Sequence, residues 1–454
     1  FPADELNDPG FGLDYHPEKK PTGNSELSRM AGFFGNLNYT YDNRYFADFS
    51  VRADASSRFG ADKRWAVFWS AGVGYNLHNE VFLKKLEWVS LLRLRASYGV
   101  TGGQNFNPYQ AMTTYRFITD KWYGYGSGAE MLALGNDDLK WQSTVQKNFG
   151  LDLGMWKDRL TLTFNYYHKL SENSLTDVTL PPSLGFPSYK ENLGEVVNEG
   201  WEFTLRGFVV KKEDFNIMLS VNGAQNNNKL KKISNSLKAF NEEQDKQVEN
   251  KVMARYVEGQ SLNTIWVVRS LGIDPANGKE LFLDKNGKRT YDWNADDYVA
   301  EATTDPRLYG NLGLGIFYRG FSLNTYVNYS LGEKAYNQTL VDRVENADKH
   351  YNCDRRVLYD RWHKPGDETF FKDVKDASVT RPTSRFVQKN NYLNMTSLNV
   401  AYEFNPRLLE PLRIKYLKLA FYMTDLFRIS TMKAERGLDY PFARTFTTSL
   451  QIRF

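Results

Sequence analysis

The chain has 454 residues with 58 Lys and Arg against 54 Asp and Glu, and its formal net charge of +4 is too small to indicate a nucleic-acid partner. Its mean hydropathy is −0.57, and no window approaches the roughly 18 to 20 apolar residues that a membrane-spanning helix needs. One cysteine, Cys353, excludes an internal disulfide framework. Aromatic residues make up 15% of the chain, and Tyr and Trp are favoured at membrane interfaces.

Apolar and polar residues alternate in about thirteen stretches, which is the pattern of β-strands with one oily and one wet face. In the last stretch, Phe446, Leu450 and Ile452 fall on one side. Gln451 and Arg453 fall on the other. The predicted strands are 30–41, 45–54, 65–77, 92–100, 149–155, 160–166, 201–209, 215–221, 308–316, 321–329, 398–404, 417–423 and 445–454.

Strand length and inner-face chemistry distinguish two all-β interpretations. A soluble β-sandwich has strands of about 5 to 6 residues, whereas these run nearer the 9 to 11 that cross a bilayer at a tilt. Charged residues also stand where a sandwich would place its core, which favours a transmembrane antiparallel β-barrel with oil outward and polar residues inward. We expect lipid-facing Leu94, Ala96, Tyr98, Leu151, Leu153, Phe203 and Leu219, and lumen-facing Asp48, Arg52, Asp54, Arg93, Arg95, Asp152, Glu202 and Arg206.

Short and long connections take turns along the chain. Outer-membrane barrels have short periplasmic turns and long extracellular loops, so the C-terminus is expected in the periplasm and residues 1–30 outside, as a loop segment. Residues 31–454 are expected to form the C-terminal part of a larger barrel, because an odd number of strands does not close one. The short connections are 42–44, 78–90, 157–159, 211–214, 319–320 and 405–415, and the long ones are 55–64, 101–144, 170–200, 225–306, 331–391 and 427–444.

Catalytic and metal signals are weak. No nucleophile, base and orienting residue stand in a recognisable set, so no catalytic residue, cofactor or metal is predicted. His350, Cys353 and His363 match no standard zinc spacing. Asn286-Gly287 is typical of a hairpin turn.

Aromatic residues in the long connections are the better candidates for binding. They could stack on sugar rings, grip a peptide or contact a partner protein, and they could equally be the internal packing of long loops. The inward charges likewise fit either a translocation path or a solvated wall that pairs with itself. The aromatic candidates are Trp122, Tyr123, Tyr125, Trp293, Tyr298, Tyr351, Tyr359 and Trp362.

Several longer stretches carry a family resemblance. The sequence resembles the C-terminal barrel portion of SusC-like TonB-dependent transporters, and the matching stretches follow one another in the family's order over most of the chain. They are 49–60 (FSVRADASSRFG), 92–105 (LRLRASYGVTGGQN), 136–153 (NDDLKWQSTVQKNFGLDL), 165–169 (NYYHK), 192–205 (NLGEVVNEGWEFTL), 272–279 (GIDPANGK) and 392–404.

The resemblance implies about the last thirteen strands of a 22-stranded barrel in the outer membrane of a Gram-negative bacterium. It implies active import of a large nutrient, either an oligosaccharide or a peptide with the oligosaccharide favoured, energised by TonB through an N-terminal part. It also implies a plug domain and further strands of the same protein, a surface-exposed SusD-like lipoprotein partner and contact with outer-membrane lipid. A TonB-dependent siderophore or cobalamin receptor and a passive porin are the alternative functions.

Overall fold

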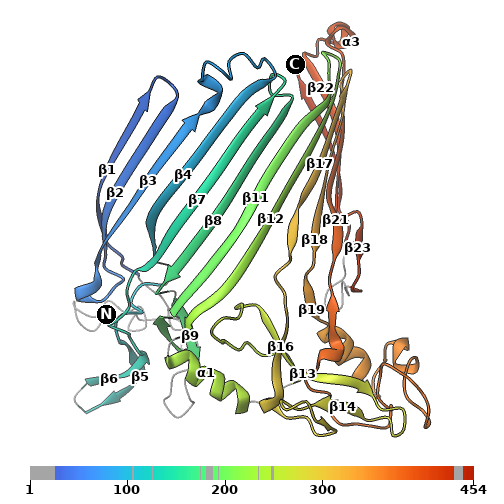
Figure 1. Cartoon of the computed structure of the whole chain (residues 1–454). Coiled ribbons are helices and arrows are strands. Elements are labelled where there is room, and N and C mark those ends of the chain that lie inside the picture. The colour runs from blue at the N-terminus through green and yellow to red at the C-terminus, as the bar shows by residue number, and fades with distance from the viewer. Residues whose placement is uncertain are drawn as a thin grey trace.

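The computed structural model describes residues 26–104, 107–124, 126–173, 175–179, 188–192, 194–233, 235–246, 250–348, 350–433 and 443–454. Its main feature is one 14-stranded antiparallel sheet in which almost every strand pairs with the next wall strand along the chain (Figure 1). The sheet order is β1-β2-β3-β4-β7-β8-β11-β12-β17-β18-β21-β22-β24, with β23 (Arg428–Ser430) paired to β21 off this path. The prediction of about thirteen wall strands is confirmed, and a sandwich of two packed sheets is excluded.

The wall strands are long enough to cross a membrane. Several continue past their predicted limits: β11 begins at Gly194 and β12 ends at Ile233, within stretches expected to be loop. The wall strands are β1 Met30–Tyr41, β2 Tyr45–Ser56, β3 Trp65–Asn76, β4 Val89–Gly103, β7 Gln142–Met155, β8 Leu160–Glu172, β11 Gly194–Lys211, β12 Phe215–Ile233, β17 Leu308–Tyr318, β18 Phe321–Leu331, β21 Tyr392–Glu403, β22 Tyr416–Thr424 and β24 Phe446–Arg453.

The register gives the sheet one apolar and one polar face. Leu94 pairs with Leu151, and Leu151 pairs with Phe164. Phe164 pairs in turn with Phe203, so four strands present large apolar side chains on the same side. We call this side the apolar face. Arg93 pairs with Asp152 on the opposite side, which we call the polar face.

The connections alternate in length, as the sequence predicted, with the short ones at the upper end of Figure 1 and the long ones at the lower end. The short turns use the left-handed backbone region, where Asn, Asp and Gly are favoured. Asp42 and Asn43 have φ of 50° and 52° in the β1–β2 turn. Arg319 and Gly320 have φ of 45° and 87° in the β17–β18 turn.

The long connections carry secondary structure of their own. Asn286-Gly287 forms the predicted turn: Gly287 has φ of 77° and donates to the Asp284 carbonyl at 3.0 Å. Short sheets pair β5 with β6, β9 with β10, β19 with β20, and β15-β14-β13-β16 in a row. These strands are β5 Thr114–Tyr123, β6 Gly126–Ala133, β9 Leu175–Thr179, β10 Ser188–Asn192, β13 Thr264–Ile273, β14 Glu280–Leu283, β15 Arg289–Thr290, β16 Tyr298–Thr303, β19 Lys334–Tyr336 and β20 Val387–Lys389.

Helices are few and short. None in the described part of the chain is long and apolar enough to span a membrane. The α-helices are α1 Asn235–Lys246, α2 Gln338–Leu340 and α3 Pro406–Leu409, a π-helical turn covers Val341–Glu345, and 3₁₀ turns cover Ala61–Lys63, Leu77–Asn79, Ala295–Asp297, Arg355–Leu358, Ser384–Phe386 and Glu410–Leu412.

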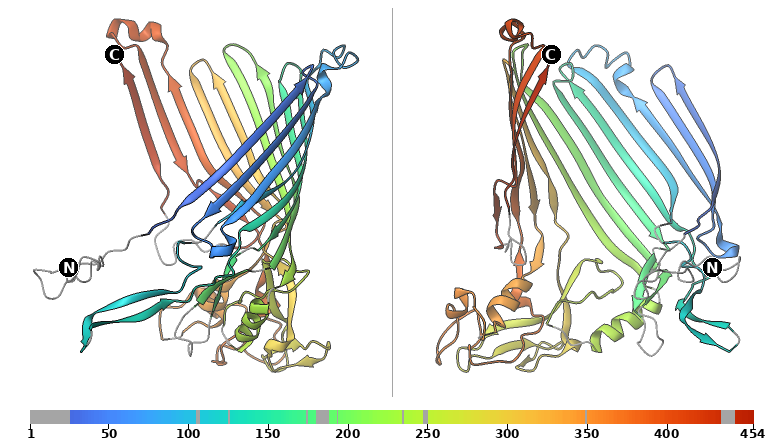
Figure 2. Two further views of the ribbon diagram at one scale, coloured as in Figure 1. Left: turned by 90° about the vertical axis from the view of Figure 1, so that its left-hand side faces the viewer. Right: turned by 180° about the vertical axis from the view of Figure 1, so that it is seen from behind.

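The sheet bends into a curved wall with β1 and β24 at its two edges (Figure 2). Each of these strands pairs with one neighbour among the described residues. No layer of the described residues packs on the apolar face, and side chains such as Phe33, Val67 and Val73 are at least 60% exposed. Most of the fully buried side chains, such as Val341 and Phe386, lie in the long connections instead.

Candidate substrate path and extracellular surface

A hydrogen-bonded network crosses four strands on the polar face. The Arg95 guanidinium on β4 donates to both carboxylate oxygens of Asp152 on β7, at 2.8 and 3.2 Å. The same guanidinium donates to the Asn165 side-chain oxygen on β8 at 3.1 Å. The Asn165 amide then donates to Glu202 on β11 at 3.2 Å. Three of the predicted inward charges therefore belong to one network that ties adjacent strands together.

The other predicted inward charges lie outside this hydrogen-bonded network and make only a few contacts each. Arg52 pairs with Asp54 at 2.6 Å within β2. Arg93 donates to the Asn76 side-chain oxygen at 2.7 Å and lies 5.6 Å over the Phe46 ring. Asp48 pairs across the sheet with Gly72. Arg206 has no ion pair among the described residues, which leaves its charge available to the space in front of this face.

A cluster of amides near the long-loop end was not anticipated. The Tyr167 hydroxyl donates to the Asn226 side-chain oxygen at 3.0 Å. Asn226 and Asn228 both donate to the Asn198 side-chain oxygen, at 3.2 and 2.9 Å. In the sequence, this cluster is visible only as the run Asn226-Asn227-Asn228. Asparagine runs are typical of turns, so the run by itself does not indicate a strand or a binding site.

This cluster borders a hollow of about 480 Å³ where β12 meets the long connections. The lining is rich in amide and hydroxyl groups, which bind neutral polar ligands by hydrogen bonds. It includes Asn226, Asn227, Asn228, Gln260, Ser261, Thr264 and Thr303, together with the charged Lys229, Asp305 and Arg307.

The two longest connections fold together. The Val268 amide donates to the Pro382 carbonyl at 3.2 Å, and the Ser270 amide donates to the Ser384 hydroxyl at 3.0 Å. A third hydrogen bond has its donor in the second connection: the Trp362 indole donates to the Pro275 carbonyl at 2.9 Å. We call residues 264–303 and 334–389 the loop unit. Its core contains Val267, Val268, Val341, Val344, Val357, Phe371 and Phe386, each at most 7% exposed.

A buried ion triad joins the two halves of the loop unit. Arg385 makes two hydrogen bonds to Glu280, at 3.0 and 2.7 Å, and one to Glu345 at 2.6 Å. All three side chains are at most 8% exposed. Burial works against the guanidinium charge, but the two carboxylates outweigh it and raise the pKa of Arg385. The triad therefore holds a fixed positive charge between two distant segments of the sequence.

Two further buried cations surround the triad. Arg361 donates to the carbonyls of Lys372 and Glu345, both at 3.1 Å. The Lys372 ammonium donates to the Ser378 hydroxyl at 3.1 Å and lies 3.8 Å from the Asp376 carboxylate. Burial lowers the pKa of both Arg361 and Lys372. Carbonyl and carboxylate oxygens hold these buried charges, while Arg361 Nε and Glu345 Oε2 have no hydrogen-bond partner among the described residues.

The predicted loop aromatics divide into packed and exposed groups. Trp293 packs edge-on against Tyr298, with ring centroids 5.6 Å apart, and its indole donates to the Pro382 carbonyl at 3.2 Å. The Trp362 ring lies on Gly278, where a Cβ would come within 2.5 Å of it. These three residues belong to the packing of the loop unit. Tyr351 and Tyr359 are 76% and 61% exposed and are available to a partner or substrate.

The remaining aromatics lie in another connection. Trp122 and Tyr123 are part of β5, which pairs with β6, and Tyr125 lies outside the described residues. Within the described part of the chain, no group of three His, Cys, Asp or Glu side chains could hold a metal ion. The Cys353 thiol is exposed and donates to the Asp348 carbonyl at 3.1 Å.

The fold and its two chemically distinct faces define a membrane-spanning β-barrel wall with elaborate loops at one end. A family model described as "TonB dependent receptor-like, beta-barrel" matches residues 4–347, and the chain belongs to this family. The chain is thus part of a β-barrel in the outer membrane of a Gram-negative bacterium, as the sequence predicted.

Curated relatives support the SusC-like resemblance. TonB-dependent receptor SusC of Bacteroides thetaiotaomicron is 28% identical over 474 residues, which cover 96% of this chain and 45% of that protein. TonB-dependent receptor P3 of Formosa agariphila is 26% identical over 478 residues, which cover 96% of this chain and 46% of that protein. The chain therefore spans about half the length of the curated relatives it matches.

Solved structures share the fold. The RagAB peptide importer in its closed-closed state matches with a TM-score of 0.79 at 24% identity, over 100% of this chain and 50% of that one. The RagAB peptide transporter matches with a TM-score of 0.78 at 24% identity, over 92% of this chain and 46% of that one. At this level of identity the likeness concerns the barrel fold.

Proposed function

We propose that the chain forms the C-terminal wall and loop unit of a SusC-like transporter that imports a large nutrient with energy from TonB. The main support for this proposal is that one member of the family has both a wall with a polar face and a folded loop unit at the end of that wall. The polar face, with its Arg95–Asp152–Asn165–Glu202 network, is the lumen side of the barrel. The apolar face is the lipid side.

Further strands are proposed to complete the barrel. β1 and β24 each have one free edge among the described residues. Unpaired backbone groups in hydrocarbon cost several kcal/mol each, so membrane barrels are closed. Strands and a plug from outside this sequence would cover both edges, and the TonB contact would lie there too.

The partner proposed for the loop unit is a surface lipoprotein of the SusD-like class. A buried ion triad and a continuous apolar core make the unit a stable platform rather than a set of mobile connections. Exposed Tyr351 and Tyr359 supply the amphipathic side chains that are enriched in protein interfaces. Replacing residues 334–389 by a short turn should release the lipoprotein, and unchanged association would exclude this docking site.

The favoured cargo is an oligosaccharide. Support comes from the amide-rich hollow beside β12, whose neutral hydrogen-bonding groups suit sugar hydroxyls. An oligopeptide is the second candidate, because the RagAB proteins that share this barrel fold are described as peptide transporters. Uptake by cells that express the intact protein should distinguish them. A labelled maltodextrin series and a labelled random peptide pool are suitable probes, and accumulation of peptides alone would reject the glycan assignment.

Two other transport functions make different predictions. A passive porin would conduct ions in a planar bilayer without removal of any plug, whereas an importer stays closed until energised. A siderophore or cobalamin receptor would purify without a surface lipoprotein. Conductance and co-purification of the intact protein therefore separate all three.

A further inference from the structure

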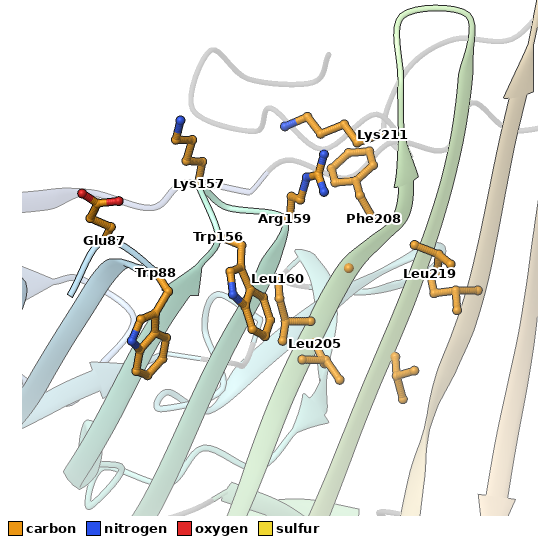
Figure 3. Close-up of a pocket in the computed structure, with 13 residues that line it drawn as sticks. Glu87, Trp88, Trp156, Lys157, Arg159, Leu160, Leu205, Phe208, Lys211 and Leu219 are labelled. Carbon is orange, nitrogen blue, oxygen red and sulfur yellow. The ribbon is translucent and has the colours of Figure 1, made fainter.

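A hollow of about 1030 Å³ lies on the apolar face at the end of the sheet with the short turns (Figure 3). Its wall is formed by β8, β11 and β12 and by the turns before β4 and between β7 and β8. Leucines from three adjacent strands, Leu160, Leu205 and Leu219, line it. Most of the hollow is on the side that faces lipid in a barrel, at the end of the sheet away from the loop unit.

Gly207 lies in the wall of the hollow. It pairs with Leu160 on β8 and with Leu219 on β12, so a residue without a side chain stands between two leucines on the apolar face. A Cβ at this position would come 3.1 Å from Leu160 Cδ1. With no side chain at position 207, the wall between the two leucines forms an apolar channel that Leu160 partly covers.

Three cationic side chains line the same hollow: Lys157, Arg159 and Lys211. Figure 3 shows them toward the turns, above Leu160 and Leu205, with Glu87 as the single acid on the far side. None of the three cations has an ion pair among the described residues. Lys211 lies 5.1 Å over the Phe208 ring, which holds it at the rim of the hollow.

Two tryptophans fix the depth of this arrangement in the membrane. Trp88 and Trp156 line the hollow and are 46% and 52% exposed. Their backbones are linked, since the Trp156 amide donates to the Trp88 carbonyl at 2.7 Å. Tryptophan indoles sit at the level of lipid headgroups. The hollow is therefore at the membrane interface, with its cations on the side toward the turns, where lipid headgroups lie.

We propose that this hollow binds one phospholipid with an anionic headgroup, drawn from the periplasmic leaflet. Its phosphate lies among Lys157, Arg159 and Lys211, and one acyl chain lies over Gly207 between Leu160 and Leu219. Unpaired cations above an apolar channel complement a molecule that is anionic at one end and apolar at the other. The site does not depend on which cargo the transporter carries.

The test uses the intact transporter, purified in mild detergent, stripped of lipid and titrated with phosphatidylglycerol while native mass spectrometry counts bound molecules. The triple variant K157Q/R159Q/K211Q should bind phosphatidylglycerol about 100-fold more weakly, since each cation near a lipid surface contributes roughly a factor of five. The matched control K84Q/K85Q/K415Q removes three cations of the same rim outside the hollow and should bind as the wild type does.

Gly207→Leu provides the second variant, because it fills the channel and leaves the cations in place. It should lose phosphatidylglycerol binding as well. The proposal is overturned if the triple variant binds like its control, or if phosphatidylcholine binds as tightly as phosphatidylglycerol. It is also overturned if excess inorganic phosphate displaces the lipid, which would make the site one for a free anion. If Gly207→Leu fails to insert, the charge variants still decide.

Discussion

Arg95 and Asp152 form a two-point ion pair across β4 and β7, and the arginine reaches its partner by passing over Gly150. A Cβ at position 150 would stand 2.9 Å from the guanidinium carbon of Arg95 and 2.9 Å from the Asn165 side-chain oxygen. The glycine thus keeps open the space through which the network crosses from strand to strand. A strand glycine usually weakens a sheet, and here its position is required by a neighbouring side chain.

Gly150→Ala should destabilise the barrel by about 1 to 3 kcal/mol, because the added methyl displaces the guanidinium and the asparagine together. The loss should appear as a lower temperature for the heat-induced mobility shift of the intact barrel. Gly103→Ala is the matched control. Gly103 lies on the polar face of the neighbouring strand β4, and a Cβ added there would be 3.9 Å from the nearest atom, Gln142 Oε1. Equal shifts for the two variants would contradict the role of Gly150.

Arg385→Leu should destabilise the loop unit by about 3 to 5 kcal/mol, since it leaves the Glu280 and Glu345 carboxylates buried without their cation. Hydrogen exchange of the intact protein should show loss of protection in β13 and β14. The control is Arg356→Gln, which removes a pair with Asp354 whose side chains are 27% and 32% exposed. That variant should cost less than about 1 kcal/mol, and a comparable loss would argue against the triad.

The loop unit should lose stability in acid. Backbone and side-chain hydrogen bonds lower the pKa of Asp274, Asp284 and Asp367, and hydrogen bonds from Arg356 lower the pKa of Asp354 to about 2. A carboxyl group with a depressed pKa in the folded state stabilises the fold above its unfolded pKa of about 4. That contribution is lost as the pH falls toward 2.

Hydrogen exchange after pH jumps can measure this loss. Protection of residues 264–303 and 334–389 should be constant at pH 5 and above, and should decline between about pH 4 and 2. Asp354→Asn should flatten part of the decline. A loop unit whose protection falls instead between pH 7 and 5 would show that histidines, not these carboxylates, govern its stability.

Tyr351→Ser combined with Tyr359→Ser should weaken the complex with the surface lipoprotein at least about tenfold, because exposed aromatics of this kind carry much of the energy of interfaces. Surface plasmon resonance with the purified lipoprotein measures the change. Tyr115→Ser is the control, since Tyr115 is 62% exposed but lies in β5, outside the loop unit. An unchanged affinity of the double variant for the lipoprotein would show that Tyr351 and Tyr359 are not part of the interface.

The wall was predictable because its strands carry a period-two signal along their own sequence. The segment from Phe446 to Arg453 pairs with β22 in the register that keeps Leu450 beside Leu419 and Ile452 beside Leu417. A one-residue slip would reverse both faces, so the alternation fixes the pairing. The outer ends of β11 and β12 were less visible, because both faces carry polar residues there: Asn198 pairs with Asn228 on one face, and Glu199 pairs with Asn227 on the other.

The loop unit was not predictable in the same way. Glu280 and Arg385 are 105 residues apart, and no local period indicates that they meet. Trp293 and Trp362 stood out as binding candidates, but an indole in a long loop gives no sign of whether it contacts its own chain or a ligand. Their partners, the Pro382 and Pro275 carbonyls, are backbone atoms that any residue supplies. Side-chain type therefore gave no information about these contacts.

We propose that this wall belongs to an importer closed by a surface lipoprotein. Affinity purification of the intact protein from outer membranes in mild detergent, followed by quantitative mass spectrometry, tests this most directly. A lipoprotein should be recovered in a one-to-one ratio with the barrel, and it should be lost when residues 334–389 are replaced by a short turn. Recovery of the barrel without any stoichiometric lipoprotein would contradict it.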